Sequence, residues 1–121
     1  MDVLPIIRET KANVIDTFYM NKNDLIMYDD RTIYRVDGGT MIRLLCMHNG
    51  TLQAHKYNDN YIIVVTDLTD LTDLFVYKYE KEQLIEYIHT KIKEYNGVSD
   101  KYLLLDDHIW TIDFDKNKII K

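Results

Sequence analysis

Short runs of β-branched and aromatic residues alternate with turn-forming residues through the first half of the chain. The runs are Leu25–Tyr28, Thr32–Val36, Met41–Met47, Leu52–Tyr57 and Tyr61–Val65. The spacers between them contain Gly, Asn or Asp, which accept a positive φ or hydrogen-bond to their own backbone and so favour tight turns. We therefore predict an antiparallel meander of about five strands in this part of the chain.

The last of these runs is apolar without interruption from Ile62 to Val65. Successive side chains of a strand point to opposite faces of the sheet, so a run with no polar position is buried on both faces. We expect a further layer of structure on each side of the sheet at this point. Two predicted helices are the natural cover.

Two segments have apolar residues at helical spacing. The first spans residues 3–20 with Pro5 in its first turn, although the residues from Asn13 to Tyr19 also fit a strand. The second spans residues 80–95, and Asn96-Gly97 supplies a stop signal after it. Its apolar positions are Leu84, Ile85, Ile88, Ile92 and Tyr95. We predict an amphipathic helix in each segment.

Residues 66–74 repeat the tripeptide Thr-Asp-Leu three times. Residues three apart are neighbours on a helix, whereas a period of three would send the leucines of a strand alternately to core and solvent. We therefore predict a helical turn or a 3₁₀-like connector with Asp67 as its N-cap. The alternative is one long helix from Leu68 to Tyr95 that begins with the repeat.

Alternating residues later in the chain predict further strands at Phe75–Tyr79, Tyr102–Leu105 and His108–Phe114, and a turn then leads into Ile119-Ile120. In the run that begins at His108, Trp110 shares a face with Ile112 and Phe114, which indicates a core residue. The whole pattern predicts a single compact acidic α+β domain over residues 1–121. It consists of an antiparallel meander of about five to eight short strands, an N-terminal helix and a helix near 80–95 packed on the sheet.

The composition favours an intracellular protein. Cys46 is the only cysteine of the 121 residues, so no internal disulfide can form. Asp2 stands where a signal peptide would carry basic residues, and no apolar run approaches the length of a membrane span. We expect a cytoplasmic protein, in the host cytoplasm if its origin is viral.

The net charge of −5 is unevenly distributed. Residues 59–74 contain four Asp and neither Lys nor Arg, and residues 97–115 contain five Asp against Lys101 alone. Phosphate contacts need clustered Lys and Arg, so nucleic acid is a poor ligand for these segments. A basic protein, or the nucleic-acid-binding site of another protein, would be attracted instead.

Acidic segments beside many tyrosines favour a protein-binding module. The chain has ten Tyr, and tyrosine supplies contact area to an electrostatically guided encounter. We expect a monomer or homodimer that blocks a basic site on its partner, as nuclease-immunity proteins and phage-encoded inhibitors of host defence do. The predicted contact residues are Asp59, Tyr61, Asp67, Asp70, Asp73, Asp106 and Asp107. The alternative is a structural subunit that self-associates through strand edges or tyrosine-rich faces.

A third hypothesis is a small metal-dependent hydrolase. Asp106-Asp107-His108, together with Asp113 and Asp115, is the cluster that most resembles a metal site, because hard cations take carboxylate oxygens. An Asp-Asp turn and solvent-exposed carboxylates explain the same residues. The chain has no nucleophile elbow, phosphate-binding loop or paired-histidine motif. We therefore expect a protein that is not an enzyme and needs neither cofactor nor metal.

Overall fold

The computed structural model describes residues 14–48, 50–67, 72–99 and 101–121, and this part of the chain contains twelve strands and no helix. The strands form three antiparallel sheets of four strands each. The prediction of an α+β fold with helices packed on one sheet is therefore wrong, and the protein is all-β.

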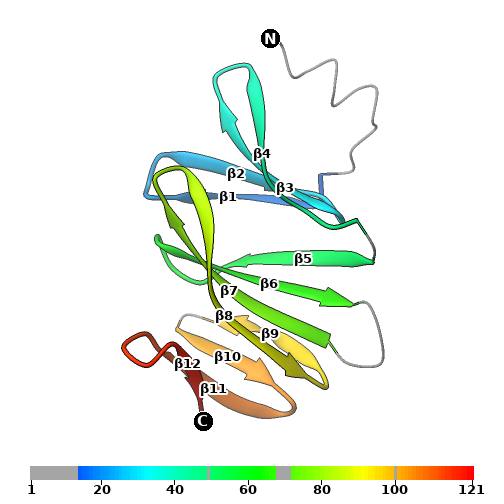
Figure 1. The fold of residues 1–121 in the computed structure, drawn as a ribbon, viewed down its shortest axis with the longest axis vertical. Coiled ribbons are helices and arrows are strands. Elements are labelled where there is room, and N and C mark those ends of the chain that lie inside the picture. The colour runs from blue at the N-terminus through cyan, green and yellow to red at the C-terminus, as the bar shows by residue number, and fades with distance from the viewer. Residues whose placement is uncertain (1–13, 49, 68–71, 100) are drawn as a thin grey trace.

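Each sheet is an up-and-down meander in which consecutive strands pair (Figure 1). The first sheet contains β1 (Asp16–Met20), β2 (Asp24–Tyr28), β3 (Thr32–Asp37) and β4 (Thr40–Cys46). The middle sheet contains β5 (Thr51–Lys56), β6 (Tyr61–Asp67), β7 (Thr72–Glu80) and β8 (Gln83–Ile92). The last sheet contains β9 (Tyr95–Ser99), β10 (Tyr102–Leu105), β11 (His108–Asp113) and β12 (Lys118–Ile120).

The strands predicted from the alternating runs are confirmed to within a few residues at each end. The predicted meander is nevertheless divided. Its first three strands became β2, β3 and β4 of the first sheet, and its last two became β5 and β6 of the middle sheet. The connection between Cys46 and Thr51 is thus a passage between layers instead of a hairpin.

The middle sheet is buried on both faces. Ile62 and Val64 of β6 pack into a core shared with the first sheet, where Ile26 and Ile33 lie. Ile63 and Val65 pack in the opposite direction, into a core shared with the last sheet. The predicted cover on each side of this run therefore exists, but it consists of two sheets and not of helices.

The predicted helix at residues 80–95 is wrong because this segment forms β8 and the start of β9. A spacing of four residues fits a strand as well as a helix, because four is a multiple of the strand period of two. A β-bulge opposite Val76 and Tyr77 then moves the pattern to the other face, so Leu84 packs on the first core while Ile88 and Ile92 pack in the second. The stop signal at Asn96-Gly97 falls inside β9.

The Thr-Asp-Leu repeat joins two strands of the middle sheet. Thr66 and Asp67 end β6 and pair with Asp73 and Thr72 of β7, so the long helix from residue 68 to residue 95 is wrong. The helical turn predicted over residues 66–74 with Asp67 as its N-cap is also wrong for its described residues, because residues 66–67 and 72–74 belong to strands. Residues 68–71 lie outside the described residues, as does most of the predicted N-terminal helix. The described remainder of that helix forms β1.

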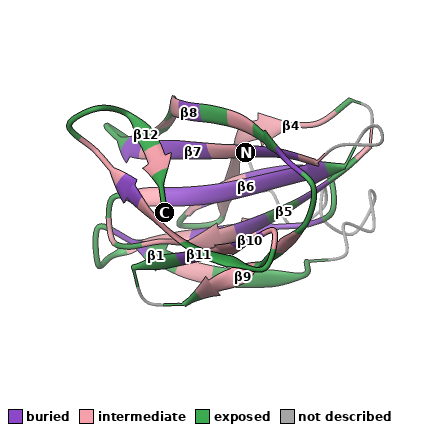
Figure 2. Cartoon of the chain, turned by 90° about the horizontal axis from the view of Figure 1, so that it is seen from below, coloured by how far each residue is buried: buried purple, intermediate pink, exposed green. Residues whose placement is uncertain are grey.

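The three sheets stack in chain order with equivalent strands on equivalent sides. The first strands adjoin, since the rings of His55 in β5 and Tyr95 in β9 lie 5.2 Å apart. The last strands adjoin on the opposite side, where β4 contacts β8 (Figure 2). Stacked four-stranded meanders are also the blades of β-propellers, so this is a known way of burying sheet faces. Trp110 lies partly buried at the second core, which confirms its predicted place.

Candidate functional site

One end of the stack gathers carboxylates from several connections. Asp67, the last residue of β6, is aligned across the sheet with Thr72 and Ile92, which places it about 10 Å from β8 at the usual strand spacing. On the other side of Asp67 lies β5, and there the N–H of Leu52 donates to the carbonyl oxygen of Asp30 at 2.8 Å. The turn after β2 and the end of β6 therefore lie at the same end of the stack.

The turn after β10 joins this group from the last sheet. The backbone N–H groups of Lys93 and Glu94, just beyond β8, donate to the carboxylate of Asp106 at 3.0 and 2.7 Å. The N–H of Asp106 in return donates to the carbonyl oxygen of Glu94 at 3.0 Å. Asp107 and His108 follow and are exposed. These bonds fix the last sheet against the end of β8.

We call this surface the acidic end and define it by Asp30, Asp67, Glu94, Asp106 and Asp107. Asp106 is half-buried and the other four are exposed. The cations of the same turns are Arg31 and Lys93, so carboxylates are in excess over the described residues of this end. Carboxylates gathered on one surface create a negative electrostatic potential there, which equal numbers of Lys and Arg in the same turns would cancel.

The sequence left open whether Asp67 shares a surface with Asp106 and Asp107, and the strand pairings and hydrogen bonds place all three at the same end of the stack. Asp30 and Glu94 were not among the predicted contact residues. The only sequence signal for Asp30 is its place in the turn Asp29-Asp30-Arg31. Because Asp30 is far from Asp67 along the chain, the sequence did not predict that both lie at the same end of the stack. Asp70 lies outside the described residues.

Asp59 and Tyr61 belong to other parts of the molecule. Asp59 lies in the β5–β6 turn at the opposite end of β6, where its carboxylate pairs with Lys56 Nζ at 2.8 Å. The hydrogen bond from Lys56 lowers the pKa of Asp59. Tyr61 packs between the middle and last sheets, with its ring centroid 4.2 Å from that of Phe114 and 5.5 Å from that of Tyr87. Neither residue contributes to the acidic end.

Asp73 is buried and its charge is already compensated. It is 8% exposed, and its Oδ1 atom lies 3.0 Å from His89 Nε2 and 3.3 Å from Lys91 Nζ. The His89 ring stacks on Phe75 with centroids 4.2 Å apart, which holds the imidazole against the carboxylate. The hydrogen bond from His89, followed by that from Lys91, lowers the pKa of Asp73. We assign Asp73 to the stability of the middle sheet.

The cluster predicted for a metal is divided between the two ends of β11. Asp106, Asp107 and His108 lie at the acidic end, whereas Asp113 ends β11 and accepts hydrogen bonds from the N–H groups of residues 115 and 116 at 3.1 Å each. Across residues 14–48, 50–67, 72–99 and 101–121, no three His, Cys, Asp or Glu side chains gather closely enough to hold a metal ion.

The described part of the chain has no helix that could cross a membrane. Comparison with known proteins gives no relative from which a function could be transferred. The chain matches no protein-family model, no curated protein and no solved structure.

Proposed function

We propose that the protein is a binding module whose acidic end docks on a basic surface of a partner protein and blocks it. The observation that carries this proposal is the convergence of Asp30, Asp67, Glu94, Asp106 and Asp107 from four separate connections at one end of the stack. A rigid all-β frame holds these carboxylates in place. Their mutual repulsion is relieved when a basic partner binds.

The chemistry of the surface indicates the class of partner. Exposed carboxylates attract Lys and Arg clusters, and such clusters are what proteins present to nucleic acid. The proposed partner is therefore a nucleic-acid-binding protein whose basic site the acidic end covers in place of phosphate. The free thiol of Cys46 favours a reducing cytoplasmic compartment for this encounter.

The test compares two triple variants of equal net charge. The first neutralises the acidic end by Asp67→Asn, Glu94→Gln and Asp107→Asn. The control neutralises the opposite end by Asp37→Asn, Asp59→Asn and Asp115→Asn. Each protein is titrated with a labelled peptide of twenty lysines at several salt concentrations, and each is used to capture partners from a cell lysate.

We expect the acidic-end variant to bind the lysine peptide about tenfold or more weakly, with a shallower salt dependence, and to lose the captured basic proteins. The control variant should stay close to the unmodified protein in both measurements. Equal weakening by the two variants would mean that net charge alone governs binding. That result would contradict a specific role for the acidic end.

A second candidate function is self-association, and the outer face of the last sheet favours it. Ile109 is 62% exposed there, Tyr102 is 40% exposed and Ile120 is 38% exposed. The register aligns Leu104 with Ile109 and Thr111 with Ile120, so these apolar side chains share one face. Light scattering tests this directly. A molar mass above that of one chain, returned to 14.5 kDa by Ile109→Glu, would support a self-associating subunit.

A further inference from the structure

The free edge of β8 is bordered by two grooves. β8 is the longest strand, with ten residues, and it ends the middle sheet, so only β7 pairs with it. In an antiparallel sheet every second residue directs its N–H and C=O groups to each edge. For Gln83–Ile92, the backbone groups on the outer edge have no hydrogen-bond partner among the described residues. In Figure 2, β8 runs along the margin of the molecule.

The grooves lie against the edges of strands and not over their faces. The first, of about 450 Å³, is lined by residues 42–44 of β4 and by residues 81–84 at the start of β8. The second, of about 290 Å³, is lined by residues 88–92 of β8 and residues 117–119 at β12. Consecutive residues of a strand point to opposite faces, so a groove that touches all of them follows the backbone edge.

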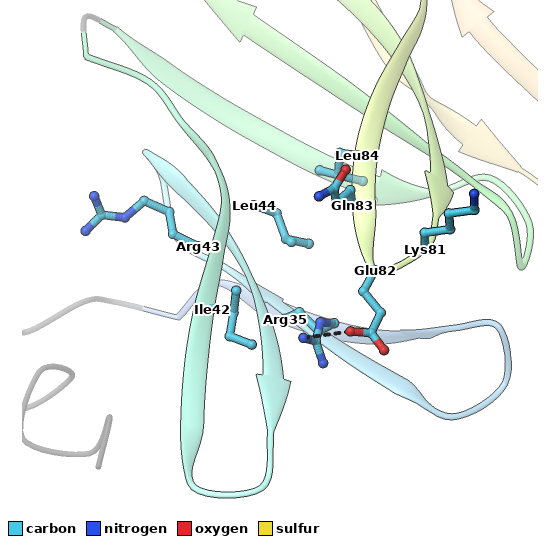
Figure 3. A pocket seen from close by; sticks show the side chains of 8 residues that line it. All are labelled: Arg35, Ile42, Arg43, Leu44, Lys81, Glu82, Gln83 and Leu84. Atoms are coloured by element: carbon cyan, nitrogen blue, oxygen red, sulfur yellow. Dashed lines mark ion pairs between the residues drawn. The ribbon is translucent and has the colours of Figure 1, made fainter. Parts of the chain in front are cut away.

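The first groove has an apolar wall and an ion pair. Leu44 and Leu84 are partly buried against the first core, and Arg35 lies at the base, 9% exposed. Arg35 Nη2 pairs with Glu82 at 3.1 Å, while its buried Nε atom has no hydrogen-bond partner among the described residues (Figure 3). Arg43 projects from β4 away from the groove in the same view and forms its rim.

The second groove has an aromatic floor. Ile88, Ile92, Leu105, Trp110 and Ile119 line it and supply its apolar surface. The indole N–H of Trp110 donates to the carbonyl oxygen of Leu105 at 3.0 Å, which fixes the ring, and Lys121 Nζ lies 5.1 Å from the ring centroid. The pocket suits one or two apolar side chains beside a strand.

The charge of the grooves is opposite to that of the protein. The cationic lining residues are Arg35, Arg43, Lys81, Lys91 and Lys118, and the acidic ones are Glu82 and Asp106. Arg35 pairs with Glu82, and Lys91 pairs with Asp73, so they are not free to bind a ligand. The whole chain has a net charge of −5. In the linings of the two grooves, the cations without an ion pair among the described residues therefore outnumber the unpaired carboxylates, which favours an acidic segment over a basic one.

We propose that the free edge of β8 accepts an extended acidic segment of a partner protein as an added antiparallel or parallel strand. The backbone of the segment pairs with the outer edge of β8. The grooves lie on opposite sides of the middle sheet, so apolar side chains of one half of the segment enter the first groove and those of the other half, shifted by one position, enter the second. Its carboxylates face Lys81 and Lys118, and Arg43 lies at the rim of the first groove. The grooves are centred near residues 83 and 90, which lie about 20 Å apart at the usual rise, so a segment of about eight to ten residues is long enough to reach both. The second groove adjoins the acidic end, because Asp106 belongs to both, but the site takes a partner of opposite charge.

The bulge at residue 87 divides the edge into two halves, one for each groove. A bulge increases the local twist, so an isolated flat strand pairs poorly across it, and edges are commonly protected in this way. A segment that binds must therefore gain from side-chain contacts in the grooves as well as from backbone pairing. This requirement makes β8 selective and limits unspecific pairing of strands.

The test uses a fluorescein-labelled decapeptide that alternates valine and glutamate within each half, with the alternation shifted by one position at its centre so that the valines of the two halves point to opposite faces. A second peptide has the same side chains but carries N-methyl groups on alternate backbone nitrogens, which prevents strand pairing. A third replaces glutamate by lysine. Binding is followed by fluorescence anisotropy and by the emission of Trp110, the only tryptophan, which lies in the second groove. Amide hydrogen exchange then identifies the protected backbone groups.

We expect the acidic peptide to bind, to change Trp110 emission and to protect alternate amides of Gln83–Ile92. The N-methylated and lysine peptides should bind about tenfold or more weakly. Lys118→Glu should weaken the acidic peptide by about three- to tenfold, whereas Lys116→Glu, outside the groove, should change affinity less than about twofold. Both lysines are exposed, so both variants should fold.

Three results would overturn the proposal. If the N-methylated peptide bound as tightly as the unmethylated acidic peptide, binding would depend on charge and not on strand pairing. Absence of protection in β8 with bound acidic peptide would place the binding elsewhere. Protection of β8 that rises with protein concentration before any peptide is added, with a doubled mass in light scattering, would identify a second copy of this chain as the occupant. The variant with substitutions at Asp67, Glu94 and Asp107 changes no residue that lines a groove. Its loss of affinity for the lysine peptide therefore tests the proposal for the acidic end, and the two proposals can fail separately.

Discussion

Ile62 and Ile63 are neighbours in β6, yet their fully buried side chains belong to two different hydrophobic cores. One packs toward the first sheet and the other toward the last sheet. The single strand β6 therefore contributes side chains to both cores.

Shortening each isoleucine tests this arrangement. Ile62→Val and Ile63→Val should each lower the free energy of unfolding by about 0.5–1.5 kcal/mol, because each leaves a small cavity. The cavities are in separate cores, so the double variant should lose the sum within about 0.5 kcal/mol. Urea denaturation of the four proteins measures these values. A coupling energy above about 1 kcal/mol would contradict two independent cores.

The turn at Asp106 and Asp107 offers a second test. It joins β10 and β11 by two residues with φ values of 51° and 61°, the conformation of a type I′ hairpin turn. A left-handed conformation is costly for residues other than glycine, so Asp107→Gly should raise the free energy of unfolding by about 0.5–1 kcal/mol. Asp115→Gly is the control, because Asp115 has no positive φ and glycine there should only add freedom to the unfolded chain. Thermal denaturation that ranks the two variants in the reverse order would contradict the assignment of strain.

The strands could be predicted from the sequence because their side chains alternate locally and their turns carry Gly, Asn or Asp. The division of these strands among three stacked sheets could not be predicted from the sequence. Nothing local distinguishes the 47–50 connection, which passes between sheets, from the 29–31 turn, which closes a hairpin. The uninterrupted apolar run at Ile62–Val65 correctly indicated two covered faces, but burial on both faces does not identify what covers them.

The helix prediction at residues 80–95 was wrong for a specific reason. Leu84, Ile88 and Ile92 repeat every four residues, and because of the bulge at residue 87 Leu84 packs on the first core while Ile88 and Ile92 are buried in the second. A bulge is set by the pairing with β7 and has no sequence signature of its own here. The candidate site shows the same limit, because only pairings between distant segments place Asp30 and Glu94 at the same end of the stack as Asp67.

The buried carboxylate of Asp73 predicts an acid-sensitive contribution to stability. Its pKa is lowered in the folded protein, chiefly by the hydrogen bond from His89, from an ordinary value of 3.8. A lowered pKa means that the unfolded chain binds the proton more tightly, so the stabilisation is present above pH 3.8 and is lost as the pH falls through the folded pKa.

Asp73→Asn should therefore lower the free energy of unfolding by about 1–3 kcal/mol at pH 7, and the difference from the unmodified protein should shrink below about pH 4. Urea denaturation at pH 7, 5 and 3 measures this. Asp115→Asn, at an exposed turn, serves as the control with a difference near zero at each pH. A deficit for Asp73→Asn that stayed constant from pH 7 to pH 3 would mean that its charge contributes nothing.

Two tyrosines at the interface of the middle and last sheets should respond oppositely to loss of the hydroxyl group. The Tyr95 hydroxyl is buried and has no hydrogen-bond partner among the described residues, whereas the Tyr87 hydroxyl donates to the carbonyl oxygen of Phe114 at 3.1 Å. Burial raises the pKa of Tyr95 well above its usual range, so the group remains neutral and its cost is that of an unpaired polar group.

Tyr95→Phe should accordingly raise the free energy of unfolding by about 1 kcal/mol, because the ring keeps its contact with His55 and the unpaired hydroxyl is gone. Tyr87→Phe should lower it by about 0.5–1.5 kcal/mol through loss of one hydrogen bond. Chemical denaturation at pH 7.5 compares both variants with the unmodified protein. Since both substitutions remove the same atom from the same layer, opposite signs would come from hydrogen bonding alone, and destabilisation by Tyr95→Phe would show that its hydroxyl has a partner.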